Sequence, residues 1–171
     1  MRLVFDSNES KRLFLSYAIP CADVLVRRKK ISKDKLNKLK SDLIQGKDIN
    51  GVEKIFVVAS SMCYIISRKM KKKRIDKKLI RKYFWHEHKK AIDWRYNFYK
   101  DFNPVFCKVY PGKVIIKKRK TAVVLTPIGK LKLKTDFIPG LLVNDLVTVH
   151  YDYIVEKITN RQFKSLWNKY K

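Results

Sequence analysis

The chain has 171 residues, which is enough for one medium domain or two small ones, and 46% of them are hydrophobic, which excludes a disordered tail. It has 41 lysine and arginine residues against 15 acidic ones, a formal net charge of +26. Self-repulsion of that size opposes compaction and favours a polyanionic partner.

Residues 1–104 are predicted to form a basic helical domain. Ser32 is placed to cap one of its helices. Asn50, with Glu53 three residues later, resembles the capping box of another helix. Asp76 precedes a helix that is expected to continue through the aromatic residues that follow.

Two dense runs of cations lie in this domain, each where a helix is expected to end. The first run would suit the negative end of a helix dipole, and the second would suit a solvated loop between helices. So dense a run cannot bury itself, however, and its repulsion falls when phosphates displace condensed counterions. The candidate phosphate-binding residues are Arg27, Arg28, Lys29, Lys30, Arg68, Lys69, Lys71, Lys72, Lys73 and Arg74.

The segment 83–102 interleaves aromatic side chains with basic ones. Such a pattern can stack on bases while pairing with phosphates. It also suits a helix that packs its rings against a neighbouring structure, which we expect for most of them. His86 and His88 point to different faces of a helix, and the HExxH pattern is absent, so no metal site is expected there.

Residues 105–158 contain short β-rich runs separated by turn signals at intervals of about ten residues, a pattern typical of a small closed or partly closed barrel. In one run three lysines alternate with Leu131 and Leu133, so the lysines share one face and the leucines lie in the core. A basic turn precedes this run. Together they predict a basic ridge, either solvated or phosphate-binding, formed by Lys117, Lys118, Arg119, Lys120, Lys130, Lys132 and Lys134.

The same region carries a Cys, three residues and then Pro-Gly-Lys-Val, beginning at Cys107. This order resembles the hydrogenase-maturation chaperones of the HypC/HupF type. The resemblance implies an OB-like β-barrel, with Cys107 and His150 as ligands of an iron ion. It continues through Thr121-Ala122-Val123-Val124, Phe137-Ile138-Pro139, Val143-Asn144-Asp145, Val149-His150 and Val155-Glu156-Lys157-Ile158.

Residues 159–171 are predicted to form a short helical tail, with Thr159 and Gln162 placed as caps. The tail could pack onto the barrel or dock on a partner. The expected fold class is therefore α+β, with a helical bundle over 1–104, an OB-like barrel over 105–158 and a C-terminal helix.

The three cysteines are widely spaced and indicate neither a disulfide framework nor a zinc motif, which fits a reducing cytosol. Cys63 lies on an apolar helix face and is expected to be a small buried hydrophobe. No apolar run approaches the roughly 20 residues that span a bilayer, and the N-terminus lacks the apolar core of a signal peptide. We expect a cytoplasmic protein.

The chain shows no nucleophile–base pair, phosphate-binding glycine loop or paired carboxylates, so neither an enzyme nor a cofactor is expected. From Cys107 onward 14 basic residues face 4 acidic ones, so the excess charge is spread over both halves. The sequence predicts a ribosome-associated or other RNA-binding protein that acts mainly through phosphate contacts. The alternative is a HypC-type metallochaperone in nickel-iron hydrogenase maturation, with Cys107 as iron ligand and the maturation proteins as partners.

Overall fold

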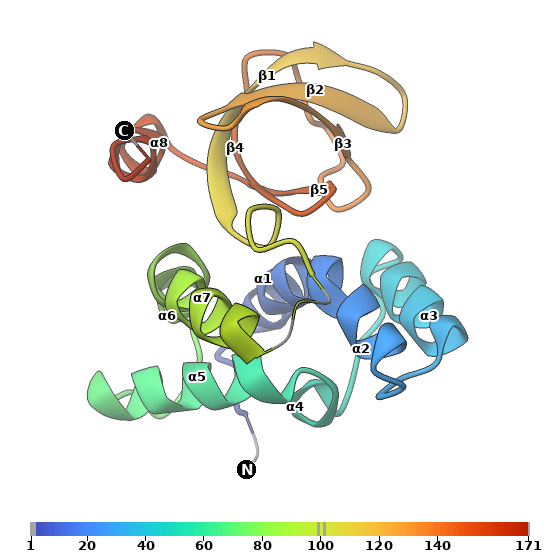
Figure 1. Cartoon of the computed structure of the whole chain (residues 1–171), viewed down its shortest axis with the longest axis vertical. Helices are drawn as coiled ribbons and strands as arrows, with labels where there is room; N and C mark the ends of the chain where they lie inside the picture. The colour runs from blue at the N-terminus through green and yellow to red at the C-terminus, as the bar shows by residue number, and fades with distance from the viewer. Residues whose placement is uncertain (1–2, 99, 101, 171) are drawn as a thin grey trace. The chain divides into compact units, whose positions relative to one another are not determined.

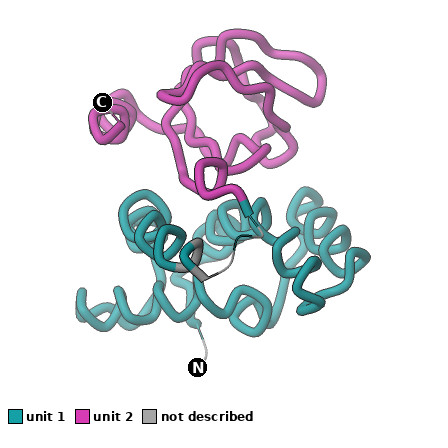
Figure 2. Tube along the Cα trace, in the orientation of Figure 1, with its two compact units in different colours: residues 1–102 teal, residues 103–171 magenta. Residues whose placement is uncertain are grey.

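The computed structural model describes residues 3–98, 100 and 102–170. The chain divides into two compact units, residues 1–102 and 103–171 (Figure 2). The first unit consists of helices, and the second contains a sheet followed by a helix (Figure 1). The expected α+β fold class is confirmed.

The helical unit is built around a cluster of aromatic rings. Phe14, Tyr17 and Phe84 are buried in it, and the rings of Tyr17 and Phe84 stack with centroids 4.8 Å apart. Around this cluster lie α1 (Asn8–Ala18), the 3₁₀ turn η1 (Ile19–Ala22), α2 (Asp23–Arg27), α3 (Lys33–Ile44), α4 (Val52–Ile55), α5 (Val57–Lys69), α6 (Lys77–Lys82), the π-helical turn η2 (Tyr83–Glu87) and α7 (His88–Phe98).

Of the caps predicted at Ser32, Asn50 and Asp76, two are confirmed and one is wrong. Ser32 Oγ accepts a hydrogen bond from the Lys35 N–H (3.1 Å), and Asp76 Oδ1 accepts one from the Leu79 N–H (2.7 Å). Asn50 caps no helix. Its side chain accepts a hydrogen bond from Lys11 instead (3.4 Å), and α4 begins after Gly51, whose φ of 69° redirects the chain.

The helix expected to continue from Asp76 through the aromatic residues is interrupted by η2. In a π-helical turn residues five apart face each other, whereas in an α-helix residues three and four apart do. Tyr83 and His88 are therefore brought together, with the Tyr83 hydroxyl 3.0 Å from His88 Nδ1.

The second unit contains a five-stranded mixed sheet that closes into a ring. Its strand order is β1-β2-β3-β5-β4, and all neighbours are antiparallel except β3 and β5. The last β-rich run of the sequence forms two strands, because the chain turns back at Tyr151 (φ 54°). The strands are β1 (Val109–Lys117), β2 (Thr121–Thr126), β3 (Gly129–Lys134), β4 (Leu146–His150) and β5 (Tyr153–Lys157).

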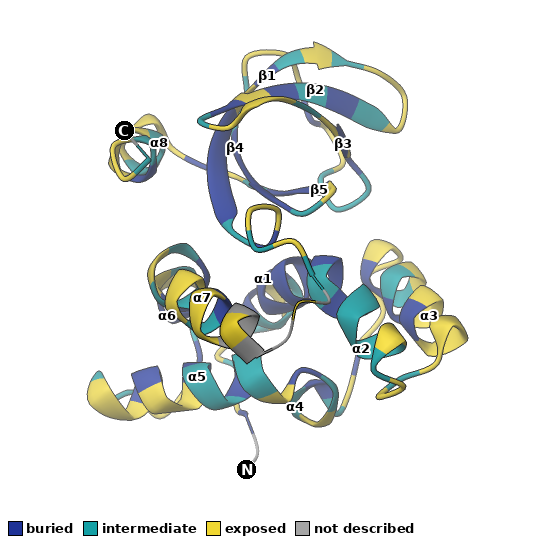
Figure 3. Ribbon diagram, viewed as in Figure 1, coloured by how far each residue is buried: buried dark blue, intermediate teal, exposed yellow. Residues whose placement is uncertain are grey.

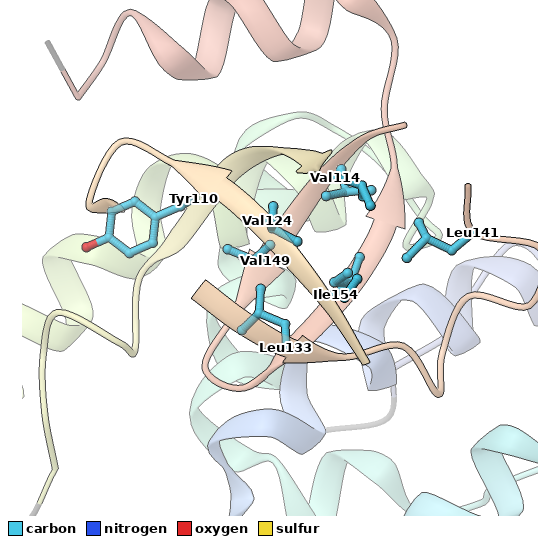
Figure 4. Close-up of a cluster of buried hydrophobic side chains, with 9 residues drawn as sticks. Tyr110, Val114, Val124, Leu133, Leu141, Val149 and Ile154 are labelled. Atoms are coloured by element: carbon cyan, nitrogen blue, oxygen red, sulfur yellow. The ribbon is translucent and has the colours of Figure 1, made fainter. Parts of the chain in front are cut away.

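The inside of the ring is packed with aliphatic side chains from every strand (Figure 4). Val114, Val124 and Ile154 are fully buried there. Gly112 of the Pro-Gly-Lys-Val run has no room for a side chain, because a Cβ would overlap Val124 Cγ1 and lie 3.3 Å from the Leu125 carbonyl oxygen. The glycine is therefore required by packing.

The C-terminal helix α8 (Asn160–Trp167) begins with the predicted capping box, in which the side chains of Thr159 and Gln162 each accept a hydrogen bond from the other residue's N–H. The residues after it return to the sheet, where the Tyr170 hydroxyl donates to the Val109 carbonyl (2.7 Å). The tail thus packs on its own unit. Among the described residues, no helix combines the length and the hydropathy needed to cross a bilayer.

Candidate nucleic-acid interface

The first basic cluster, residues 27–30, lies where the chain turns back at the end of α2. The Lys30 N–H donates to the Leu25 carbonyl (2.9 Å), and the Lys29 N–H donates to the Val26 carbonyl (2.9 Å). This is a Schellman motif, which places the residue after the helix cap in a left-handed conformation that favours glycine. That residue is Lys29, at φ 54°. Arg27, Lys29 and Lys30 are exposed, and Arg28 is half-buried.

The second basic cluster, residues 68–74, is built in the same way at the end of α5. The Lys72 N–H donates to the Ser67 carbonyl (2.8 Å), the Lys71 N–H donates to the Arg68 carbonyl (3.1 Å), and Lys71 has a φ of 53°. The end of α5 is exposed (Figure 3). The Ser67 and Arg68 carbonyls at this helix end are hydrogen-bonded within the motif, and the charged side chains of the cluster face solvent.

Glycine does occupy this position at the end of α3, where Gly46 has a φ of 75° in the same motif. An L-residue in the left-handed region costs about 1–2 kcal/mol. Lys29 and Lys71 therefore occupy positions at which glycine would be more stable. A basic side chain is present at both despite that penalty.

Among the described residues, Lys72 is the cation of the second basic cluster that forms an ion pair with an acidic side chain. It forms an ion pair with Asp76, whose carboxylate also caps α6. Burial raises the pKa of Asp76, but the hydrogen bonds from Lys72 and from the Leu79 N–H lower it by more than burial raises it. The net shift of this pKa is therefore downward. Within the described parts of the chain, no ion pair is formed by Arg68, Lys69, Lys71, Lys73 or Arg74.

The three lysines of β3 share the outer face of the ring, as the alternation predicts. Lys130, Lys132 and Lys134 are exposed, whereas Leu133 is buried and Leu131 packs at the edge of the core. Lys134 is ion-paired with Asp152 (2.6 Å), and this hydrogen bond raises the pKa of Lys134. Lys130 and Lys132 stand opposite Leu125 and Val123 on β2.

The basic turn between β1 and β2 adjoins the end of β3. Lys118, Arg119 and Lys120 are exposed, and the Lys120 carbonyl accepts a hydrogen bond from the Thr135 N–H (3.2 Å) just after β3. Lys117 is half-buried, and its ammonium donates to the carbonyls of Lys118 and Arg119. The turn therefore lies beside the Lys134 end of β3, and its cations together with the β3 lysines make up the basic ridge of this unit.

Cys107 and His150, singled out by the family resemblance, lie together in the second unit. Cys107 Sγ and a ring nitrogen of His150 are within 4.8 Å, and both residues are buried. His150 Nε2 is 2.9 Å from the Cys107 carbonyl, to which it can only donate. In the neutral ring, Nδ1 is then unprotonated and carries the lone pair. An unprotonated ring nitrogen is the atom of a histidine that binds a metal ion.

The helical unit contains a similar pair that the sequence did not reveal. Cys21 Sγ lies within 4.8 Å of a ring nitrogen of His88, and both residues are half-buried. His88 reaches this position because of the π-helical turn, while His86 remains exposed. Cys63, in contrast, is fully buried, and burial raises the pKa of its thiol, so it is the inert hydrophobe that was expected.

Most of the described rings of the segment 83–102 are structural, as expected. Tyr83 and Phe84 are buried, and the Trp85 indole donates to the Tyr17 hydroxyl (2.7 Å). Trp94 is the exception, with 63% of its surface exposed. Tyr99 and the side chains of Arg95, Tyr96 and Phe98 lie outside the described residues.

The helical unit also contains a cavity of about 490 Å³ beside the second basic cluster. Arg68, Lys71 and Lys73 contribute to its lining together with Tyr64, which sequence analysis did not single out. The spacing of four residues between Tyr64 and Arg68 is the signal that could have identified the ring, since it places the two side chains on one helix face.

Comparison with protein-family models finds no match to the chain, and comparison with curated proteins finds none either.

Proposed function

We propose that this protein binds RNA, chiefly through phosphate contacts, as a component of the ribosome or of another large structured RNA assembly. The observation that carries the proposal is the state of the cations: exposed lysines and arginines gather at two helix ends and along one ridge. The chain has 41 basic and 15 acidic residues, so its acidic side chains can neutralise only a minority of its positive charge. Phosphates would supply the missing charge and release counterions.

The position of the basic ridge supports the same function by analogy of fold. OB-type rings bind oligonucleotides on the face of strands 2 and 3 and with the loops that join strands 1–2 and 4–5. Here the ridge occupies β3 and the β1–β2 loop. Its neighbours Val123 and Leu125 are aliphatic, so this face would hold the phosphate backbone without reading the base sequence.

The test is binding of the full chain to ribosomes and to purified ribosomal RNA over a potassium chloride series from about 0.05 to 0.5 M, where phosphate contacts weaken strongly. A triple variant, Lys118→Gln, Arg119→Gln and Lys120→Gln, is compared with a control that loses three exposed lysines elsewhere, Lys35, Lys47 and Lys54. We expect the logarithm of the association constant to fall linearly with the logarithm of the salt concentration. The ridge variant should bind more weakly than the control.

Equal losses in the two triple variants would remove the ridge from the proposed interface. If the wild-type protein does not bind RNA even at the lowest salt concentration, the proposed function is wrong.

A second function is favoured by the pair Cys107 and His150, which follows the HypC-like order of residues. We propose as the alternative that these two side chains carry an iron ion as cargo during nickel-iron hydrogenase maturation. A thiolate and an imidazole are suitable ligands for iron. Two protein ligands leave the other coordination positions to exogenous ligands, as release of the cargo requires.

The alternative is tested with Co²⁺ as a spectroscopic probe, because thiolate coordination gives a charge-transfer band. The band should disappear in Cys107→Ala and persist in Cys63→Ala, which removes a fully buried cysteine. Loss of the band in Cys21→Ala but not in Cys107→Ala would assign the ion to the helical unit and contradict the alternative.

A further inference from the structure

We propose that the cavity at the end of α5 is a nucleotide-binding pocket, in which Tyr64 stacks on the base while Arg68, Lys71 and Lys73 bind the phosphate. The inference rests on the proposed RNA binding and assigns to it a specific subsite. The same chemistry would accept a free nucleotide or one nucleotide splayed out of an RNA strand.

One wall of the pocket is formed by the N-terminal segment. Phe5 and Ile75 form a parallel β-bridge, in which the Ile75 N–H donates to the Val4 carbonyl (2.8 Å) and the Asp6 N–H donates to the Ile75 carbonyl (3.1 Å). This bridge fixes Leu3 and Val4 beside the loop that follows α5. Leu3 and Ile75 are buried and give the cavity apolar lining.

The other wall is the last turn of α5. Tyr64 and Arg68 are one turn apart and therefore share a face of the helix. Tyr64 is 42% exposed and Val4 is 48% exposed, so both present apolar surface to a ligand that enters the cavity. Aromatic rings at such a site bind any base, because every base has a π-face.

The charges of the pocket select an anion. Arg68, Lys71 and Lys73 are exposed, and no acidic partner is found for them in the described parts of the chain. A helix C-terminus normally repels an anion through its free carbonyls. Here the carbonyls of Ser67 and Arg68 already accept hydrogen bonds from the loop, and Arg68, Lys71 and Lys73 line the same cavity.

A bare anion would need the cations but not the ring or the apolar wall. The cavity volume of about 490 Å³ lies within the range of small-ligand pockets, and one opening brings ring, apolar wall and cations together. A nucleotide has parts that fit all three: the π-face of its base can stack on the ring and cover the apolar wall, and its phosphate can bind the cations.

The test measures the affinity of the full chain for a fluorescein-labelled ten-nucleotide RNA single strand, for the same sequence as a duplex, and for AMP as competitor. Tyr64→Ala and Lys73→Gln are the pocket variants. Their matched controls are Ile65→Ala, an exposed neighbour on α5, and Lys69→Gln, a cation of the same cluster; neither contributes to the lining. Tyr64→Phe keeps the ring, and circular dichroism verifies the fold of each variant.

We expect Tyr64→Ala to weaken single-strand binding about tenfold without changing its salt dependence, as loss of one stacked base does. Tyr64→Phe and Ile65→Ala should bind as the wild type does, and Tyr64→Ala should leave duplex binding unchanged. Lys73→Gln should weaken binding more than Lys69→Gln does. Competition by AMP would show that the pocket also accepts a free nucleotide, and binding of the strand that AMP does not displace would show that the pocket requires a nucleotide held in RNA.

The pocket is disproved if the wild type binds RNA and Tyr64→Ala binds it as tightly as Ile65→Ala. That result leaves the proposed function standing. Conversely, Tyr64-dependent binding of AMP by a protein that binds no RNA would support the pocket and refute the proposed function.

Discussion

At the scale of single residues, a lysine in the left-handed conformation lowers the stability of the fold but adds a positive charge at a helix end. Lys29 at the end of α2 occupies a position that favours glycine, with a φ of 54°. Lys29→Gly should therefore be more stable than Lys29→Ala by about 1 kcal/mol, although both variants lack the charge. In a unit of this size that difference raises the melting temperature by about 4–8 °C.

The measurement is thermal unfolding of the two variants, together with their affinity for RNA. Both should lose the same affinity, because each lacks the same ammonium group. Equal melting temperatures would show that the backbone at this position carries no conformational penalty.

Gly112 is the second residue whose identity follows from its surroundings. An alanine there would overlap Val124, which is fully buried and β-branched and therefore has little freedom to move. Gly112→Ala should destabilise the second unit by about 1–3 kcal/mol, the usual effect of overpacking a core. Chemical denaturation checks this, with Gly140→Ala as a control for which no atom lies within 4 Å of the added Cβ. Because Gly140 has a φ of 76°, the stability lost in Gly140→Ala should reflect only backbone strain.

At the scale of elements, the start of α6 depends on the charge of Asp76. The pKa of this carboxyl is lowered, so its contribution to stability is present above the unfolded pKa of about 3.9 and is lost as pH falls through the lower folded value. Asp76→Asn keeps a capping side chain but removes the ion pair with Lys72. At pH 7 the variant should be less stable by up to about 1 kcal/mol.

The difference between Asp76→Asn and the wild type should shrink as pH falls below about 4 and through the lower folded pKa of Asp76, because the wild-type side chain is then protonated and uncharged as well. Urea unfolding from pH 7 to pH 2.5 measures it. A difference that stays constant across this range would show that the cap does not depend on the carboxylate charge.

At the scale of the whole molecule, the net charge of +26 opposes folding in both units. Potassium chloride screens this repulsion, since the Debye length falls from about 30 Å at 0.01 M to about 8 Å at 0.15 M. The melting temperature of the free protein should therefore rise over that range while its affinity for RNA falls. A melting temperature that falls with salt would indicate that the ion pairs, and not the repulsion, dominate the electrostatics of the fold.

The sequence predicted those parts of the fold that depend on near neighbours. The caps at Ser32, Asp76 and Thr159 are local, because each side chain bonds an N–H three residues away. The lysines of β3 were placed correctly on the outside because side chains alternate along a strand. The capping box predicted at Asn50 is wrong, because the Asn50 side chain accepts a hydrogen bond from Lys11, a residue distant in the sequence.

By itself, then, the sequence determined the α+β class, the exposed basic clusters and the alternation of the ridge, since all of these follow from composition and from periods of two or about four residues. Only the tertiary structure decided which distant residues meet. Tyr64 joins Val4 in one cavity because the N-terminal segment pairs with Ile75, and His88 meets Tyr83 because a π-helical turn shifts the register. Such contacts depend on how the whole unit packs, and no local pattern encodes them.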